Sequence, residues 1–254
     1  MVKTSPVRLF HVSDLHFGAE DAAALAWFAG TVETERPDAV IVTGDLTMRA
    51  RAGEWAAAEA WLGRLPVPVS VEPGNHDLPY FNPVRRLLRP YGRHARLVAA
   101  IGKPLNLPGV WLVPLRTTAR FQWRLNWSRG VVGRGSLAEA LAKLRACPPG
   151  HLAIVACHHP LGDSIGRSAA KRTRGGGEAL AALARAGAGA VLSGHVHDPF
   201  DMVSQAGPRL IGAGTLSQRV RRTPPSFNAL TIVDGRLEVD VRTMPSAPPG
   251  SFSP

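Results

Sequence analysis

The chain has 254 residues, of which 45% are apolar and 19% are charged, as is usual for a globular protein. Lys and Arg exceed Asp and Glu by 30 − 19 = 11, an excess that phosphate-binding enzymes share with nucleic-acid-binding proteins. Two cysteines exclude a disulfide framework, and no apolar run reaches the roughly 20 residues of a membrane span. Since no signal peptide is evident either, these features predict a cytoplasmic protein.

Apolar strands and helices are predicted to alternate through the first three quarters of the chain. Strands are predicted at residues 7–12, 39–43, 67–71, 110–115, 151–156 and 190–193. Helices are predicted at residues 21–35, 54–65, 81–89, 136–146 and 178–186. The fourth helix is expected to begin with a capping box from Ser136 to Glu139. Continuous apolar strands between helices indicate a sheet that is covered on both faces.

After residue 197 the pattern changes to short strands without helices, predicted at 202–205, 209–212, 229–233 and 237–241. Asp234-Gly235 predicts a hairpin turn between the last two strands. The second half is therefore expected to contribute its own, partly antiparallel sheet. Together these elements predict an α/β fold of two stacked sheets with outer helices. It would form a single domain over residues 1–243, followed by a flexible tail at 244–254.

Five polar segments stand where predicted strands end. They are Asp14-Leu15-His16, Gly44-Asp45, Gly74-Asn75-His76-Asp77, Cys157-His158-His159-Pro160 and Gly194-His195-Val196-His197. Because ligand sites of open sheets lie at the carboxyl ends of strands, we expect the five segments to converge. Carboxylate, imidazole and amide groups suit Mn, Fe, Co, Ni or Zn better than Ca. The set is large enough for two ions and favours a dinuclear metallohydrolase.

Each segment also has a simpler explanation when it is taken alone. Asp-x-His and Gly-Asp are common in capped turns, and an Asn or a His can cap a strand end. The occurrence of all five segments in order, each at a strand end, favours a metal centre over unrelated turns. The lack of cysteine ligands argues against a structural zinc site.

With these motifs the chain resembles the calcineurin-like metallophosphoesterase superfamily over residues 7–243. The resemblance implies a four-layer αββα sandwich of two mixed β-sheets flanked by helices. It also implies two divalent or trivalent metal ions, with Mn, Fe or Zn as candidates. By motif, the first ion would be held by Asp14, His16, Asp45 and His197. The second would share Asp45 as a bridge and be completed by Asn75, His158 and His195.

The resemblance also implies roles for the polar residues beside the ligands. Two cations about 3.5–4 Å apart can share a hydroxide that attacks phosphorus in line with the leaving oxygen. His76 is the expected catalytic residue, because it can stabilise the phosphate and protonate the leaving group. Asp77 either orients His76 or caps the following turn. His159 is expected to stand behind the ligands.

The expected partner is a small-molecule phosphate ester. Within the superfamily the motifs are most similar to class III cyclic-nucleotide and glycerophosphodiester phosphodiesterases. A phosphomonoesterase or broad phosphatase is the main alternative, followed by a nuclease and by a catalytically silent scaffold. Nucleic acid is disfavoured because the related nucleases carry extra domains for which the chain has no room. The natural substrate, the native metals and the oligomeric state stay open.

Two basic segments are candidates for substrate contact. Residues 116–134 combine arginines with aromatic residues, which can stack a base and pair with phosphate. The alternative for this segment is a surface loop whose tryptophans pack onto the core. Residues 164–177 are either a mobile basic lid or a solvated run of charge. The candidate contacts are Arg116, Arg120, Trp123, Arg124 and Arg172.

Overall fold

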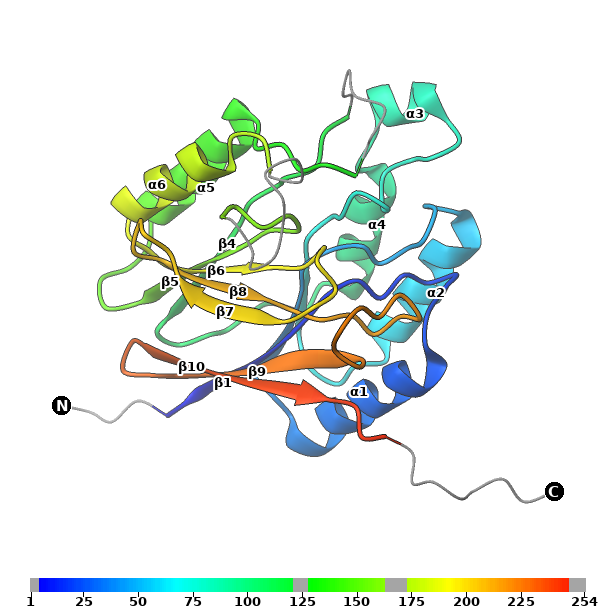
Figure 1. The fold of residues 1–254 in the computed structure, drawn as a ribbon, viewed down its shortest axis with the longest axis horizontal. Coiled ribbons are helices and arrows are strands. Elements are labelled where there is room, and N and C mark those ends of the chain that lie inside the picture. The colour runs from blue at the N-terminus through cyan, green and yellow to red at the C-terminus, as the bar shows by residue number, and fades with distance from the viewer. Residues whose placement is uncertain (1–4, 121–127, 163–172, 247–254) are drawn as a thin grey trace.

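Two five-stranded sheets stack face to face with helices on their outer faces (Figure 1). The computed structural model describes residues 5–120, 128–162 and 173–246. The first sheet has the order β10-β9-β1-β2-β3, with bounds Ser226–Val233 (β9), Arg236–Thr243 (β10), Val7–Val12 (β1), Ala39–Val42 (β2) and Val69–Val71 (β3). The second has the order β4-β5-β6-β8-β7, with bounds Val110–Pro114 (β4), Leu152–Ala156 (β5), Ala188–Ser193 (β6), Phe200–Val203 (β7) and Arg209–Gly212 (β8).

Helices form the outer layers of this sandwich. The described helices are α1 (Ala22–Glu35), α2 (Ala52–Gly63), α3 (Pro83–Leu88), α4 (Gly92–Ile101), α5 (Arg134–Arg145) and α6 (Gly176–Arg185). Helices α1, α2 and α4 share a buried apolar cluster with the first sheet, and α5 and α6 share another with the second. The expected four-layer α/β sandwich of two mixed sheets is therefore confirmed. Among the described residues, each helix is too short or too polar to cross a lipid bilayer.

The central strands are apolar on both faces because both of their faces are buried. In β9, Phe227 and Ala229 pack toward the helices of the first sheet. The alternate residues Leu230 and Ile232 pack against the second sheet. Alternate residues of one strand therefore fill two different layers: one set packs under the helices, and the other packs between the two sheets.

The hairpin of β9 and β10 does not lie in the sheet in which it was expected. Its turn is as predicted, with Asp234 and Gly235 both in the left-handed region, at φ 49° and 75°. The hairpin, however, joins the first sheet, where β9 pairs antiparallel with β1. The second half does not form a sheet of its own. Strand β4 from the first half pairs with β5, and only β7 is antiparallel in that sheet.

Two details of the helices differ from the predictions. Helix α5 begins at Arg134 after Gly133, so the expected capping box at Ser136 is not its start. The Ser136 hydroxyl instead donates a hydrogen bond to the carbonyl oxygen of Arg116, at 2.8 Å. Helix α4 was not predicted, although Leu97 and Ile101 are spaced by one helical turn and both contact the core of the first sheet.

A buried carboxyl group follows β3. Glu72 is almost fully buried beside a pocket of about 170 Å³ that Arg116 and Lys143 also line. Burial raises the pKa of Glu72 from 4.5 to about 8, although the positive charges of Lys143 and Arg116 act in the opposite direction. At pH values between 4.5 and about 8, Glu72 keeps a proton in the folded state that it has released in the unfolded chain. The free energy of unfolding therefore falls as pH rises through this window.

We expect Glu72→Gln to relieve this loss of stability, because the amide imitates the neutral carboxyl group. The variant should match the native protein near pH 4 and become more stable as pH rises. The difference in the free energy of unfolding between the variant and the native protein should grow by up to roughly 1.4 kcal/mol per pH unit. It should level off above about pH 8. Denaturant unfolding across this range measures it, with the exposed Glu178→Gln on α6 as a control. A gap that does not change with pH would contradict the prediction.

Candidate metal centre

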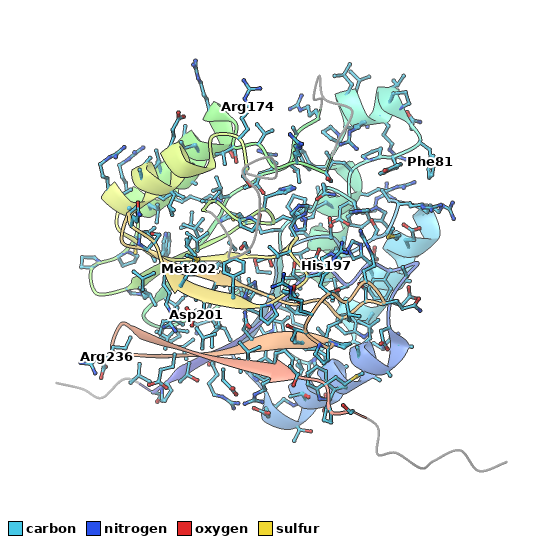
Figure 2. All side chains as sticks on the ribbon, viewed as in Figure 1. Phe81, Arg174, His197, Asp201, Met202 and Arg236 are labelled. Atoms are coloured by element: carbon cyan, nitrogen blue, oxygen red, sulfur yellow. The ribbon has the colours of Figure 1, made fainter. Side chains whose placement is uncertain are left out.

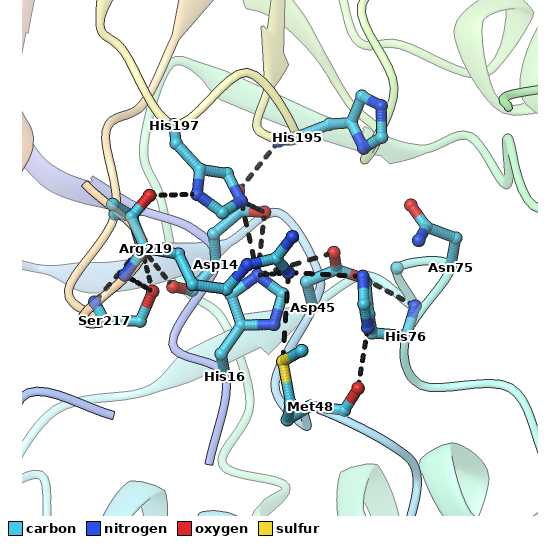
Figure 3. Close-up of polar contacts among 12 residues, drawn as sticks. Asp14, His16, Asp45, Met48, Asn75, His76, His195, His197, Ser217 and Arg219 are labelled. Atoms are coloured by element: carbon cyan, nitrogen blue, oxygen red, sulfur yellow. Dashed lines mark hydrogen bonds and ion pairs between the residues drawn. The ribbon is translucent and has the colours of Figure 1, made fainter. Parts of the chain in front are cut away.

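The five polar segments meet at the carboxyl ends of the parallel strands. Residues with potential ligand atoms follow β1, β2, β3, β5 and β6: Asp14, His16, Asp45, Asn75, His158, His195 and His197. Figure 3 labels Asp14, His16, Asp45, Asn75, His195 and His197 around a common centre. Sequence-distant segments are thus brought together as expected from the parallel strands.

One group of ligand atoms forms around Asp14. Its Oδ1 lies 3.0 Å from Nε2 of His197 and 3.6 Å from Nε2 of His16. The two imidazole nitrogens are 3.3 Å apart. All three side chains are buried. A carboxylate and two imidazoles that converge in this way are a suitable donor set for a transition-metal ion.

A second group forms around His158. Its Nε2 lies 3.3 Å from Oδ2 of Asp45 and 3.1 Å from Oδ1 of Asn75. The ring of His195 is 5.2 Å from the His158 ring, centre to centre. The same Asp45 Oδ2 lies 3.8 Å from Nε2 of His16 in the first group. Asp45 is thus the carboxylate common to both groups, and the donors fit two ions that share it.

Each carboxylate has one oxygen engaged by the backbone. Oδ2 of Asp14 accepts the N–H of His195 at 2.7 Å, which leaves Oδ1 toward His197. Oδ1 of Asp45 accepts the N–H of His76 at 2.8 Å, which leaves Oδ2 toward the histidines. These bonds link loops from different strands and orient one oxygen of each carboxylate to the centre.

Two imidazoles are oriented by carbonyl oxygens. Nδ1 of His197 donates to the carbonyl of Arg219 at 2.8 Å, and Nδ1 of His158 donates to the carbonyl of Thr43 at 2.7 Å. Each bond places Nε2 of the ring toward the centre. Such support from behind the ligands is usual at metal sites, because it selects the tautomer that can bind a cation.

The backbone at the centre is strained. Eight non-glycine residues among those described have a positive φ, and five of them carry ligand atoms: Asp14, His16, Asp45, His195 and His197, at φ 48° to 68°. This region is uncommon for side chains other than glycine, and each such residue costs of order 1–3 kcal/mol. The strain is concentrated where the loops turn their side chains inward.

Glycines allow these loops to approach closely. A Cβ atom at Gly74 would lie 2.1 Å from Oδ1 of Asp45, and one at Gly194 would lie 1.8 Å from Oγ of Ser13. Any side chain at either position would push a carboxylate-bearing loop outward. The glycines of the Gly-Asn-His-Asp and Gly-His-x-His segments are therefore a requirement of packing at the centre.

The local charges favour a bound cation. Burial alone would raise the pKa of Asp14, but His197 and His16 hold it well below its usual range. Asp45 behaves in the same way next to His158, so both carboxyl groups stay ionised. Burial opposes charge on His158, but Asp45 prevails and raises its pKa to about 9. Anionic carboxylates buried this deeply require positive charge beside them.

His76 stands at the edge of this centre. Its Nδ1 donates to the carbonyl oxygen of Met48 at 2.6 Å, which leaves Nε2 toward His16 (Figure 3). Asp77 does not contact this ring in the described contacts. Its carboxylate accepts the N–H groups of Gly74, Thr47 and Leu46, at 2.9, 2.9 and 3.2 Å. Of the two roles predicted for Asp77, the structure favours the turn cap, and Met48 orients His76.

His159 lies behind the second group. Its ring is 4.7 Å from that of His158 and 4.6 Å from that of His195. Its Nδ1 is 3.0 Å from the hydroxyl of Thr117, and its Nε2 donates to the carbonyl of Ser128 at 3.1 Å. With both nitrogens engaged away from the carboxylates, His159 is placed to support the neighbouring rings.

The predicted substrate contacts are only partly described. Arg116 lines the pocket beside Glu72, 3.6 Å from Glu139, with its guanidinium over the Tyr91 ring. Among the described residues, its contacts are with Glu139, Tyr91 and Ser136, away from the metal centre. Arg120 is exposed, and its carbonyl accepts a hydrogen bond from Arg86. Trp123, Arg124, Arg172 and most of the predicted lid lie outside the described residues.

Arg219 is a residue of the centre that the sequence analysis did not identify. Nη1 of its guanidinium lies 3.2 Å from Nε2 of His16 and 3.3 Å from Nε2 of His76 (Figure 3). It comes from the loop between β8 and β9, whose Thr215 donates to the carbonyl of Asp14 at 2.6 Å. In the sequence it stands in an arginine-rich run, which gave no signal that separated it from Arg221.

The comparison with known families agrees with this geometry. Residues 7–199 match the model of the calcineurin-like phosphoesterase family. The chain belongs to the calcineurin-like phosphoesterases. The two groups of ligand atoms that share Asp45 are compatible with a metal-dependent phosphoesterase.

Three known proteins are similar to this calcineurin-like phosphoesterase. The glycerophosphodiester phosphodiesterase GpdQ of Enterobacter lignolyticus (strain SCF1) is 36% identical over 80 residues, which are 27% of this chain and 29% of that protein. A dimetal phosphatase from Danio rerio has a TM-score of 0.65 at 16% identity, over 94% of this chain and 99% of the other. GAP50, the anchor in the inner membrane complex of Plasmodium, has a TM-score of 0.63 at 12% identity, over 94% and 85%. At these identities the two structures share the fold.

Proposed function

We propose that this protein hydrolyses small-molecule phosphodiesters of the cyclic-nucleotide or glycerophosphodiester type in a metal-dependent reaction. The observation that carries the proposal is Asp45, whose carboxylate is common to two groups of ligand atoms beside His76. The local identity to a glycerophosphodiester phosphodiesterase supports a diester as the substrate. Two ions of Mn, Fe or Zn are the proposed cofactors, and the cytoplasm is the proposed location.

The seven ligand residues would divide between the two ions as their distances suggest. Asp14, His16 and His197 would hold the first and Asn75, His158 and His195 the second, with Asp45 shared. Ions bound here would supply Lewis-acid charge for the phosphoryl oxygens and a water molecule of lowered pKa. The buried, pre-oriented side chains keep the developing charge in a site of low dielectric, where electrostatic stabilisation is strongest.

His76 and Arg219 would act on the phosphate directly. Because Nδ1 of His76 donates to the Met48 carbonyl, Nε2 is the nitrogen that would deliver a proton to the leaving oxygen. The guanidinium of Arg219, 3.3 Å from that nitrogen, would hold a phosphoryl oxygen by charge-assisted hydrogen bonds.

A phosphomonoesterase is the second candidate, and Arg219 is the observation that favours it. A monoester carries more negative charge than a diester, so a guanidinium at the centre stabilises the monoester more strongly. The fold likeness to a dimetal phosphatase is compatible with either substrate.

Hydrolysis by the purified protein, stripped of metal and reloaded with Mn²⁺, tests the proposal. Bis(p-nitrophenyl) phosphate is compared with p-nitrophenyl phosphate, and Asn75→Ala controls for contaminating activity. We expect a metal-dependent diester rate well above the monoester rate. A dominant monoester rate would assign the chain to the phosphatases. The absence of a metal-dependent rate on both would contradict the enzymatic proposal and favour a scaffold.

A further inference from the structure

A second, strongly basic pocket lies next to the segments that carry His76. Its volume is about 250 Å³, and its walls come from the loop before α2, the segment before and in α3, and the start of α4. Four arginines line it together with two aromatic rings: Arg49, Arg51, Arg85, Arg93, Tyr80 and Phe81. We call this cavity the arginine pocket.

The positive charge of the arginine pocket has little compensation. Across the described residues, no ion pair with a carboxylate involves Arg49, Arg51, Arg85 or Arg93. The nearby carboxylate of Glu54 accepts the backbone N–H groups of the first two at 2.7 and 3.1 Å. Arginines gathered around one cavity repel one another, so an anion that enters it relieves this repulsion.

One of the four is held in place by the backbone. The guanidinium of Arg93 donates to the carbonyl oxygen of Ala50, which ties α4 to the loop before α2. Burial lowers the pKa of Arg93, and the positive charges of Arg85 and Arg96 lower it further, while Glu54 acts in the opposite direction. The Arg93 guanidinium is thus fixed beside other positive charges that repel it. A negative ligand in the pocket would find this charge already in position.

Exposed aromatic rings stand at the same pocket. Phe81 is 67% exposed and Tyr80 is 58% exposed, with ring centres 5.6 Å apart. The guanidinium carbon of Arg51 lies 5.7 Å from the centre of the Phe81 ring. Figure 2 shows Phe81 at the surface near α3. An apolar ring that is left open beside arginines suits a ligand with both an aromatic face and negative charge.

The arginine pocket and the metal centre share two chain segments. Met48, whose carbonyl holds the His76 ring at 2.6 Å, directly precedes Arg49 in the pocket wall. Pro79, another wall residue, follows His76 by three positions. Both segments therefore connect the metal centre directly to the wall of the arginine pocket.

We propose that the arginine pocket binds a second phosphate group of a nucleotide substrate, with the base against Phe81. This inference rests on the proposed phosphoesterase function and narrows its substrate, among cyclic nucleotides, to those that carry a phosphate group beyond the one cleaved. The arginines would pair with the second phosphate by charge-assisted hydrogen bonds, and the ring would stack on the base.

Calorimetric titration of the metal-loaded full chain with adenosine 5′-(α,β-methylene)diphosphate tests the proposal. The methylene bridge resists hydrolysis, so binding is measured without turnover. We expect the double variant Arg51→Gln, Arg85→Gln to weaken binding by about tenfold or more. The matched control is Arg145→Gln, Arg185→Gln, which removes the same charge from exposed positions on α5 and α6. Metal content and thermal unfolding establish that each variant is folded.

The outcomes separate the pocket from general electrostatics and from the enzymatic proposal. Equal affinity in the native and pocket variants, or equal weakening by both double variants, would overturn the proposal. Phe81→Ala should weaken binding of the nucleotide analogue more than binding of pyrophosphate. An equal effect on both would contradict the proposed contact between the base and Phe81. Because calorimetry needs no turnover, selective weakening in a chain without esterase activity would uphold the pocket and reject the proposed reaction.

Discussion

Replacing Asp45 with alanine should remove bound metal and hydrolysis together. Its Oδ2 is the carboxylate oxygen close to imidazoles of both ligand groups, 3.8 Å from His16 Nε2 and 3.3 Å from His158 Nε2. Without it two buried groups of imidazoles lose the anion between them. Turnover should fall by at least about three orders of magnitude, or roughly 4 kcal/mol of transition-state stabilisation. Metal content by mass spectrometry, measured beside the rate, tests the prediction.

A matched control is Asp240→Ala, which removes an exposed carboxylate on β10 that pairs with Arg242. It should bind metal and turn over as the native protein does. If Asp45→Ala kept two ions per chain and lost only activity, the shared-ligand role would be wrong. If Asp45→Ala kept full activity, the candidate metal centre would not be the site of hydrolysis.

Replacing His76 with alanine should have a different effect, with both ions retained and most turnover lost. General acid catalysis contributes about 10²–10⁴-fold, so kcat should fall within that range. The loss should be larger for diesters with alkyl leaving groups than for p-nitrophenyl esters, because a poor leaving oxygen depends more on a proton. Rates on a leaving-group series, together with metal content, distinguish the acid from a structural residue. His151→Ala, before β5, is the control.

The His76 experiment also separates two arrangements of the ligands. Ligand atoms of His76, His16 and Asp45 all lie within 4.8 Å of one another, a geometry that also suits direct coordination. Loss of one ion in His76→Ala would make His76 a ligand. Equal losses for good and poor leaving groups would contradict the acid role.

The layered fold and the meeting of the five segments could be predicted, because both follow from parallel strands. Strands that are apolar throughout must be covered on both faces, and polar residues after them must gather at one edge. Which sheet receives β9 could not be predicted. Phe227 and Leu230 point to opposite faces and both are apolar, so the pattern fits a central strand of either sheet.

Other features of the metal centre could not be predicted, because the type of a residue does not determine them. The left-handed conformations of Asp14 and His195 depend on neighbouring loops, since neither residue type specifies a positive φ. The position of Arg219 depends on a loop without periodicity, which Thr215 and the His197 ring hold through hydrogen bonds. Contacts of this kind arise only after the strands have assembled.

The pairing of β1 with β9 has a consequence for how the molecule is made on the ribosome. Val7–Val12 is translated well before its antiparallel neighbour, Ser226–Val233, since strands β2 to β8 lie between them in the sequence. Pairing of segments so distant in sequence is slow, because a large loop must close before contacts form. The nascent chain must therefore hold an apolar strand with one open edge until Ser226–Val233 has been translated. The carboxylates after that strand can be fully positioned only when the last hairpin has docked.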